Sequence, residues 1–322
     1  MMRRAATVWA GLITALCLAN SPAFGQAKPL HLVVPFPPGG ATDITARVVA
    51  EPMSRILGQP VVVENRAGAG GSIGMLEVAR AAPDGNTLGV ATLSTHGVNP
   101  AVYKNLPYDP IKNFAPVTQL VKAPGILVVN AKLPVENFAQ FVAYLKANPD
   151  KLSYASPGNG TIGHMWGEMF KSATGTSMTH VPYKGAGPAL NDVLGGQVAV
   201  YFDQVAPSVP HIQSGKLRAL AVSWDQRLEA LPQVPTYAEL GFVSLNDPSW
   251  FGLVAPAGTP AAAIRRVRDA AVTALKDPAV VARLASLGLY ASGTTPEAFG
   301  QEIAHEIEKM RLIGEKAGIK AD

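Results

Sequence analysis

The stretch Val34-Pro35-Phe36-Pro37-Pro38-Gly39-Gly40-Ala41-Thr42-Asp43 joins a short apolar run, Leu30–Val34, to a segment of helical periodicity at residues 44–57. Its two glycines let the backbone approach a ligand with no side chain in the way. At a helix start, several backbone N–H groups lack a partner within the helix, and the dipole favours negative charge. We therefore expect a turn that binds a carboxylate. An ordinary tight turn with Thr42 as N-cap is the alternative.

A second glycine-rich loop lies further along the chain, at Ser156-Pro157-Gly158-Asn159-Gly160-Thr161. Residues 158–163 match the G-x-G-x-x-G fingerprint of a dinucleotide site and lie between an expected strand and an expected helix. That site also needs an acidic residue about 20 positions further on, and residues 180–184 contain none. We expect the loop to bind a smaller anion. Two such loops suit a ligand with a carboxylate and a second polar end.

Short apolar runs alternate with helical segments along the rest of the chain. This pattern is typical of βαβ units, and it predicts an α/β fold with mostly parallel sheets covered by helices on both faces. Strands are expected at residues 30–34, 60–64, 87–91, 152–155, 198–202 and 217–222, and helices from near Thr42, Ser72, Val135, Thr161, Ala186, Pro260 and Pro296.

Two stretches, residues 119–130 and 248–256, look like places where the chain passes from one domain to another. If both are crossovers, domain 1 is discontinuous. It comprises residues 28–124 plus 252–322, and domain 2 comprises residues 125–251. Ligands of open α/β sheets bind beyond the carboxyl ends of the strands, so the two glycine-rich loops should face each other across a cleft.

The N-terminus has the layout of a secretory signal peptide, because Arg3 and Arg4 precede an apolar run at residues 5–19 and a stretch of small residues. The run is shorter than the ~20 residues that cross a bilayer as a helix. We expect residues 1–25 to be removed and the mature protein to reach the periplasm. The only cysteine, Cys17, lies in this segment, so no disulfide or thiolate chemistry is expected in the mature chain.

Charge and histidine spacing exclude several classes of partner. The formal net charge is +4, and loss of Arg3 and Arg4 leaves +2 with the basic residues scattered. No nucleic-acid partner is therefore expected. The six histidines include no pair at metal-ligand spacing, so we expect neither a metal nor a cofactor.

Gly70-Gly71-Ser72-Ile73-Gly74 matches the G-x-S-x-G nucleophile elbow of hydrolases. That elbow follows a strand at once, whereas residues 64–69 intervene here, and no acid and histidine stand out as partners. We interpret Ser72 as the N-cap of a helix that begins at Ile73. No catalytic residue is expected, and a secreted serine hydrolase is the less favoured alternative.

Seven segments carry a family resemblance, at residues 34–43, 62–71, 82–85, 99–101, 154–161, 181–185 and 251–256. Together they make the chain similar to the tripartite tricarboxylate transporter receptor family, also called Bug or TctC-like periplasmic binding proteins. The resemblance implies a two-domain type II periplasmic-binding fold that closes on its ligand. It also implies a carboxylate held largely by backbone and water.

The ligand-binding residues expected on this basis are Phe36, Pro38, Gly39, Gly40, Ala41, Thr42, Asp43, Ser94, Ser156, Gly158, Gly160, Thr161, His164 and Asp203. Asp203 faces the cleft in this interpretation, with capping of the following helix as the alternative. His164 either contacts the ligand or bonds to backbone, and Trp166 is expected in the core rather than in the cleft.

The expected partners are a small carboxylate and the membrane subunits of a tripartite tricarboxylate transporter, with the protein itself a monomer. The alternative partner is the periplasmic domain of a sensor kinase. Dicarboxylates, tricarboxylates, amino acids and aromatic acids all remain open as ligands, because contacts made by backbone and water leave little trace in the side chains.

Overall fold

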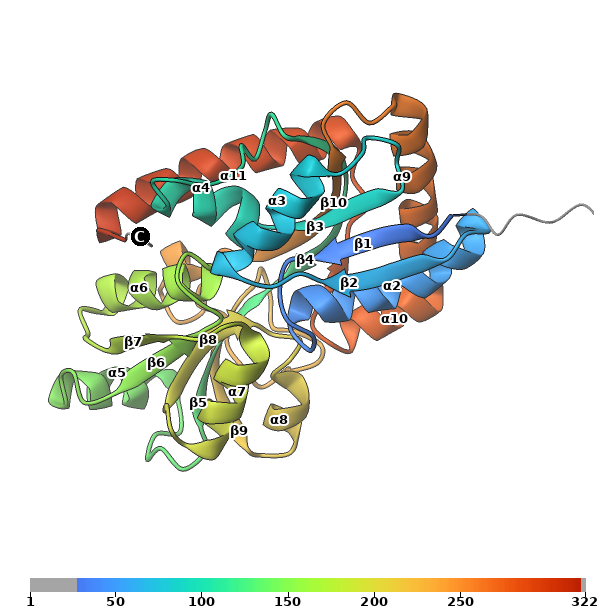
Figure 1. Cartoon of the computed structure of the whole chain (residues 1–322). Helices are drawn as coiled ribbons and strands as arrows, with labels where there is room; N and C mark the ends of the chain where they lie inside the picture. The colour runs from blue at the N-terminus through green and yellow to red at the C-terminus, as the bar shows by residue number, and fades with distance from the viewer. Residues whose placement is uncertain (1–27, 320–322) are drawn as a thin grey trace, which may run out of the picture.

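A computed structural model describes residues 28–319 of the chain, so the expected signal peptide and Cys17 lie outside the described residues. The chain forms two β-sheets flanked by helices, one above the other in Figure 1. The sheets have six strands in the order β11-β4-β10-β3-β1-β2 and five strands in the order β7-β6-β8-β5-β9. The α/β class and the two sheets flanked by helices confirm the expected fold.

The first sheet combines strands from both ends of the chain. Its strands are β1 (Leu30–Val34), β2 (Val61–Asn65), β3 (Thr87–Thr92), β4 (Phe114–Ala123), β10 (Ser249–Pro256) and β11 (Tyr290–Ala291). The helices beside it are α2 (Ala41–Leu57), α3 (Ser72–Arg80), α4 (Asn99–Val102), α9 (Ala261–Leu275), α10 (Pro278–Ala285) and α11 (Pro296–Ala317), with short turns η1 (Ala69–Gly71) and η2 (Ser94–Val98).

Strand alternation divides the core of the first sheet between its two faces. Leu30, Leu32 and Val34 pack on one side in a cluster with α2, α9 and α10. Val33 points to the opposite side, into a cluster with α3 and α11. Because both faces are covered, β1 is apolar except at His31, which explains why it reads as a nearly continuous hydrophobic run.

The second sheet is built from the middle of the chain. Its strands are β5 (Gly125–Asn130), β6 (Ser153–Ser156), β7 (Thr179–Pro182), β8 (Val200–Gln204) and β9 (Leu217–Ser223). Its helices are α5 (Phe138–Ala147), α6 (Ile162–Thr174), α7 (Ala186–Gly195) and α8 (Val209–Gln213), and the turn η3 (Val243–Leu245) follows β9.

All six expected strands are present, within two residues of the expected ends. The expectation of mostly parallel sheets needs a correction. Strands β1, β2 and β3 pair in parallel, as do β6, β7 and β8, but β10 and β5 run antiparallel to both of their neighbours. The chain enters the second sheet at β5, directly after β4, and returns to the first sheet at β10, after β9. Neither strand follows a helix within its own sheet, so no βαβ unit sets its direction.

Two helix starts also differ from expectation. The helix expected near Val135 begins at Phe138, because the side chain of Asn137 caps it by accepting a hydrogen bond from the N–H of Gln140. The interpretation of Ser72 as an N-cap is wrong, because Gly71 is the N-cap and Ser72 is already helical.

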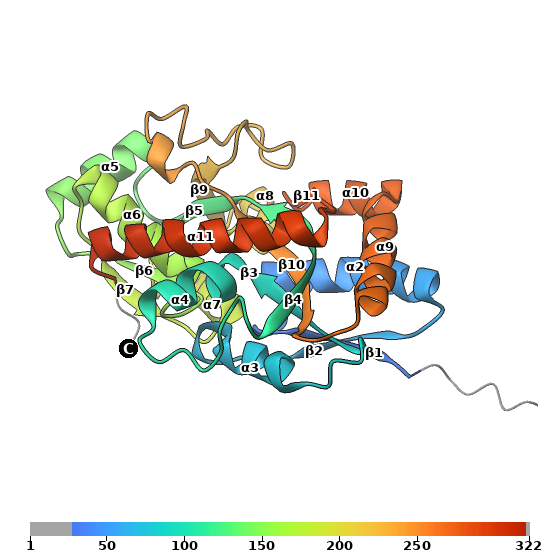
Figure 2. The same ribbon diagram turned by 90° about the horizontal axis from the view of Figure 1, so that it is seen from above.

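The two sheet regions contact each other beyond the connecting strands. The rings of Trp224, after β9, and Tyr290, in β11, stack with centroids 4.5 Å apart. Seen from above, the long helix α11 runs across the molecule from β11 toward α6 (Figure 2). Within residues 28–319 no helix combines the length and apolarity needed to span a bilayer.

Candidate functional site

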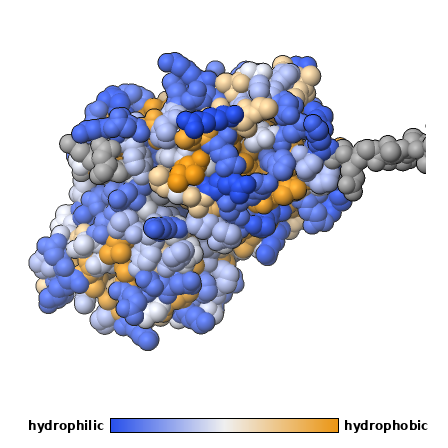
Figure 3. Space-filling view, in the orientation of Figure 1, coloured by the Kyte–Doolittle hydropathy of each residue, from blue (hydrophilic) through white to orange (hydrophobic). Residues whose placement is uncertain are grey.

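A pocket lies between the two sheet regions, at the carboxyl ends of several strands. Its lining consists of Phe36, Gly40, Ala41, Thr42, Thr92, Ser94, Pro157, Thr161, Ile162, Ala186, Asp203, Gln204 and Phe251. The cavity has a volume of about 20 Å³, roughly enough for one water molecule. An outer groove of about 700 Å³ adjoins it and shares Phe36 and Pro157. On the face drawn in Figure 3, hydrophilic residues predominate and hydrophobic ones form small separate groups.

Three helices begin at this pocket. Gly40 is the N-cap of α2, Thr161 is the N-cap of α6, and Ala186 is the first residue of α7, and all three residues line the pocket. The first N–H groups of each helix lack intrahelical acceptors, and the dipoles place positive potential there. No lysine, arginine or histidine belongs to the lining. Any attraction for an anion therefore comes from backbone groups.

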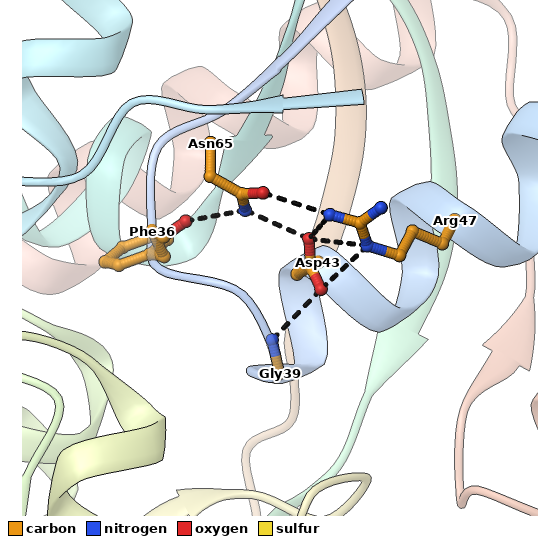
Figure 4. Close-up of polar contacts among 5 residues, drawn as sticks. All are labelled: Phe36, Gly39, Asp43, Arg47 and Asn65. Carbon is orange, nitrogen blue, oxygen red and sulfur yellow. Dashed lines mark hydrogen bonds and ion pairs between the residues drawn. The ribbon is translucent and has the colours of Figure 1, made fainter. Parts of the chain in front are cut away.

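Asp43 holds the first glycine-rich loop from behind, as Figure 4 shows. Its buried carboxylate accepts hydrogen bonds from the N–H of Gly39 at 3.0 Å, from Arg47 and from Asn65. The Asn65 amide also donates to the carbonyl of Phe36 at 2.9 Å. Burial acts to raise the pKa of Asp43, but the bonds from these three partners keep it below its ordinary value. The loop is thus fixed before any ligand arrives.

Side chains of its own segment fix the second glycine-rich loop. The hydroxyl oxygen of Ser156 accepts the N–H of Gly158 at 3.2 Å, and the Thr161 hydroxyl donates to the carbonyl of Gly158 at 2.7 Å. This bond ties the loop to Thr161, the N-cap of α6. The first turn of α6 therefore keeps its position at the pocket.

Two stacked histidines support this loop. The rings of His164 and His180 lie 4.1 Å apart and nearly parallel, and His180 Nε2 lies 2.7 Å from the Ser156 hydroxyl. His164 Nδ1 accepts the N–H of Gly160 at 3.4 Å. Burial lowers the pKa of His164, and it lowers the pKa of His180 to about 3. Both rings are neutral at physiological pH. Of the two roles expected for His164, the structure shows the bond to backbone.

Two hydrogen bonds cross the pocket region from one sheet region to the other. Ser94 Oγ accepts the N–H of Ile162 at 3.0 Å. The hydroxyl of Tyr103 donates to the carbonyl of Asn159 at 3.0 Å. These contacts join η2 and the segment after α4 to the loop before α6 and to its first residue.

Asp203 is the one ionisable side chain in the pocket lining. It is only 1% exposed. The Tyr201 hydroxyl donates to Oδ2, while Oδ1 has no hydrogen-bond partner. Burial raises the pKa of Asp203 to about 7, although the hydrogen bond from Tyr201 and the nearby backbone N–H of Gln204 both act to lower it. Asp203 therefore faces the pocket and does not cap a helix.

The pocket brings together half of the expected binding residues. Those in the lining are Phe36, Gly40, Ala41, Thr42, Ser94, Thr161 and Asp203. The others lie behind the lining or beside it: Pro38, Gly39, Asp43, Ser156, Gly158, Gly160 and His164. Of these, Gly158 belongs to the outer groove.

Sequence reasoning missed six lining residues, namely Thr92, Pro157, Ile162, Ala186, Gln204 and Phe251. Two of them could have been found, because Thr92 ends a strand and Ala186 starts a helix that the periodicity predicted. The signal was the same as for the glycine-rich loops, namely a loop that follows a strand and opens a helix.

The residues singled out for other roles have structural partners. The Ser72 hydroxyl accepts a hydrogen bond from the Asn99 amide at 3.2 Å, and no histidine contacts it among the described hydrogen bonds. Trp166 is buried in the core cluster, and its ring would meet a Cβ at Gly125 within 2.7 Å. This confirms the core role of Trp166. In the described part of the chain no group of three or more His, Cys, Asp and Glu could hold a metal.

The family model and a named relative both match one family of receptors. A model of the tripartite tricarboxylate transporter family receptor matches residues 45–319. Protein BugT of Bordetella pertussis is 38% identical over 295 residues, which cover 91% of this chain and 90% of BugT.

Solved structures are similar over most of the chain. One described as a periplasmic transporter is 50% identical, with a TM-score of 0.90, and covers 94% of this chain and 100% of its own. Rpa4515 of R. palustris with adipate is 34% identical with a TM-score of 0.88, covering 91% and 98%. MatC of Rhodopseudomonas palustris with bound malate is also 34% identical, with a TM-score of 0.85, covering 89% and 98%.

Proposed function

Because the chain belongs to the tripartite tricarboxylate transporter receptor family, whose members are periplasmic binding proteins and not enzymes, we propose that it captures a small carboxylate in the pocket between the two sheet regions. We further propose that it delivers this ligand to the membrane subunits of a tripartite tricarboxylate transporter.

The convergence of three helix N-termini on a pocket without a cationic side chain carries this proposal. A carboxylate in this position accepts hydrogen bonds from backbone N–H groups that lack an acceptor within their own helix. Each charge-assisted bond contributes on the order of 1.5 to 3 kcal/mol. Two or three of them supply much of a micromolar affinity, which corresponds to about 8 kcal/mol. The relatives solved with adipate and with malate support a carboxylate.

Closure of two domains is part of the proposed mechanism. We assign residues 28–124 plus 252–322 to domain 1 and residues 125–251 to domain 2. A cavity of about 20 Å³ is too small for an acid of four to six carbons, so the domains must separate for the ligand to enter. The Ser94–Ile162 and Tyr103–Asn159 hydrogen bonds then form again on closure.

Export through a cleaved signal peptide places the protein where such a ligand is captured. The family is periplasmic, and the arginines and the apolar run at the N-terminus supply the signal. We propose that the mature protein works as a monomer.

A thermal-shift screen of the protein purified from the periplasm tests the carboxylate proposal. Succinate, malate, adipate, citrate, glutamate and benzoate form a suitable panel. A ligand at a hundredfold excess over its Kd stabilises the native state by about 2.7 kcal/mol, so at least one of them should raise Tm by several degrees. If none of the six binds in calorimetry, the proposal of a small-carboxylate ligand is contradicted for the dicarboxylates, tricarboxylate, amino acid and aromatic acid tested.

The sensor alternative needs a separate experiment. Affinity purification from solubilised membranes, with and without the ligand found in the screen, should recover the transporter subunits in the presence of ligand. Recovery of a sensor kinase in their place would favour the alternative.

A further inference from the structure

One oxygen of the Asp203 carboxyl group has a hydrogen-bond partner in the protein and the other has none. Tyr201 and Asp203 lie on the same face of β8 because side chains alternate along a strand, and the Tyr201 hydroxyl donates to Oδ2. Oδ1 is buried without a partner in a side chain that lines the pocket. Buried polar atoms are nearly always hydrogen-bonded, so Oδ1 marks the position of a ligand group.

The charges around the pocket favour a ligand with two negative charges. Each helix N-terminus is equivalent to roughly half a positive charge, and α2, α6 and α7 all begin here. An ionised Asp203 would cancel much of this potential. A neutral Asp203 leaves it available for a dianion.

The position of the proton on Asp203 follows from its partner. Tyr201 donates to Oδ2, so Oδ2 is an acceptor, and a proton on this carboxyl belongs on Oδ1. Burial raises the pKa of Asp203 to about 7. Near neutral pH, a substantial fraction of the protein therefore carries a proton on Asp203.

We propose that the ligand is a dicarboxylate and that Asp203 binds its second carboxylate as a neutral acid, through a hydrogen bond from Oδ1–H. This inference rests on the proposed function, since the first carboxylate is the one at the helix N-termini. When Asp203 is ionised in the free protein, binding of the dianion takes up one proton from solvent, and no covalent bond other than this O–H forms.

Other titratable groups near β8 are engaged elsewhere. Those on the packed elements are Tyr154 on β6, His164, Glu168 and Lys171 on α6, and Asp192 on α7. Tyr154 and Lys171 both donate to Glu168, Asp192 accepts from Tyr183, and His164 stacks on His180. β5 carries no titratable side chain. A titration seen in binding near pH 7 therefore reports on Asp203.

Calorimetry of the wild-type protein with succinate and with adipate between pH 6.5 and 9 tests the inference. Both carboxylates of these probes stay largely ionised throughout, because ordinary carboxyl groups have pKa values of about 4 and the second carboxyl of a diacid titrates only modestly higher. Above pH 7 the Kd should rise, approaching about tenfold per pH unit, and it should level off toward pH 6.5. Measurements in two buffers of different ionisation enthalpy should show uptake approaching one proton per ligand at pH 8.5.

Asp203→Asn removes the titration but keeps an N–H donor for the carboxylate. We expect this variant to bind with a Kd that does not change between pH 6.5 and 9. The matched control is Asp225→Asn, at an exposed aspartate after β9, which should keep the wild-type slope. If Asp203→Asn does not fold, the proton uptake of the wild-type protein still decides the question.

Amino analogues of equal chain length test the class of ligand. The proposal expects succinate to bind more tightly than 4-aminobutanoate, and adipate more tightly than 6-aminohexanoate, because an ammonium group cannot accept from Oδ1–H. A wild-type Kd independent of pH, a slope that persists in Asp203→Asn, or tighter binding of the amino analogues would each overturn it. Absence of binding by any mono- or dicarboxylate would contradict the proposed function, whereas carboxylate binding that fails these tests contradicts only this inference.

Discussion

Ser94 Oγ accepts a hydrogen bond from the backbone N–H of Ile162 at 3.0 Å, and both residues line the same pocket. Ser94 lies in η2, beside the first sheet, whereas Ile162 is the first residue of α6, beside the second sheet. The bond exists only while the two regions are together. It therefore links closure of the pocket to the atoms that would surround a ligand.

Ser94→Ala should weaken ligand binding about fivefold with little change in Tm without ligand. The variant removes one hydrogen bond of the closed state, worth about 1 kcal/mol. Calorimetry with the ligand found in the screen measures the change. Ser286→Ala is the control, because its hydroxyl bonds only to Arg283 within the exposed end of α10. Equal Kd values for Ser94→Ala and the control would show that the bond does not stabilise the bound state.

Gly40→Val should abolish binding while the protein still folds. A Cβ at Gly40 would lie 3.3 Å from the Cβ of Ala186 across the pocket, so a branched side chain prevents closure and covers the N-terminus of α2. Gly40 has φ −77, a conformation open to other residues, so backbone strain is not the cause. The control is Gly195→Ala, where a Cβ meets nothing within 4 Å. Retained affinity in calorimetry would remove this loop from the site.

Ligand binding should select a more compact state. Saturating ligand should lower the radius of gyration measured by solution X-ray scattering, because the free protein samples an open arrangement that admits the ligand. Tyr103→Phe, which removes the hydrogen bond to Asn159, should raise the ligand concentration needed for this change. Identical scattering profiles with and without ligand, when calorimetry shows binding, would mean that closure is not part of the mechanism.

Asp43 should make the fold sensitive to acid. Its pKa is lower in the folded protein than the ordinary value of 3.8, so its stabilising effect is present above pH 3.8 and is lost as the pH falls through the folded-state pKa. Asp43→Asn should lower the free energy of unfolding at pH 7 by about 1–3 kcal/mol, with a smaller loss below pH 4. Urea unfolding at pH 7 and pH 3 measures both values.

The control for Asp43 is Asp269→Asn on α9, an aspartate that is largely exposed and paired with Arg268. It should change stability by less than about 1 kcal/mol. An Asp43→Asn variant as stable as this control would show that the network behind the loop is not needed for folding.

The protein should be recovered from the periplasm in a shortened form. Arg3, Arg4 and the apolar run at residues 5–19 predict recognition and cleavage before Lys28. Mass spectrometry of the periplasmic fraction should give a mass that lacks about 25 residues. Full-length protein confined to the cytoplasm would contradict this prediction.

Several features could be predicted from the sequence because they are encoded locally. Period and apolar content predicted six of the eleven strands in the described residues, and the glycines and prolines of residues 34–43 predicted a loop that opens a helix. The antiparallel direction of β5 and β10 could not be predicted in this way, since an apolar run looks the same in either direction. The wrong N-cap at Ser72 has a similar cause, because a serine before an apolar helix is a good cap unless a glycine before it already occupies that position.

The sequence by itself determined the α/β class, the family resemblance and the two glycine-rich loops, because each depends on residues close together in the chain. Only the tertiary structure decided that α7 also begins at the pocket, that Ser94 meets Ile162, and that Asp203 keeps one oxygen free. These contacts join residues far apart in sequence, and no periodicity records them. Asp203 shows the physical reason most clearly: burial by distant segments, and not its neighbours in the chain, raises its pKa.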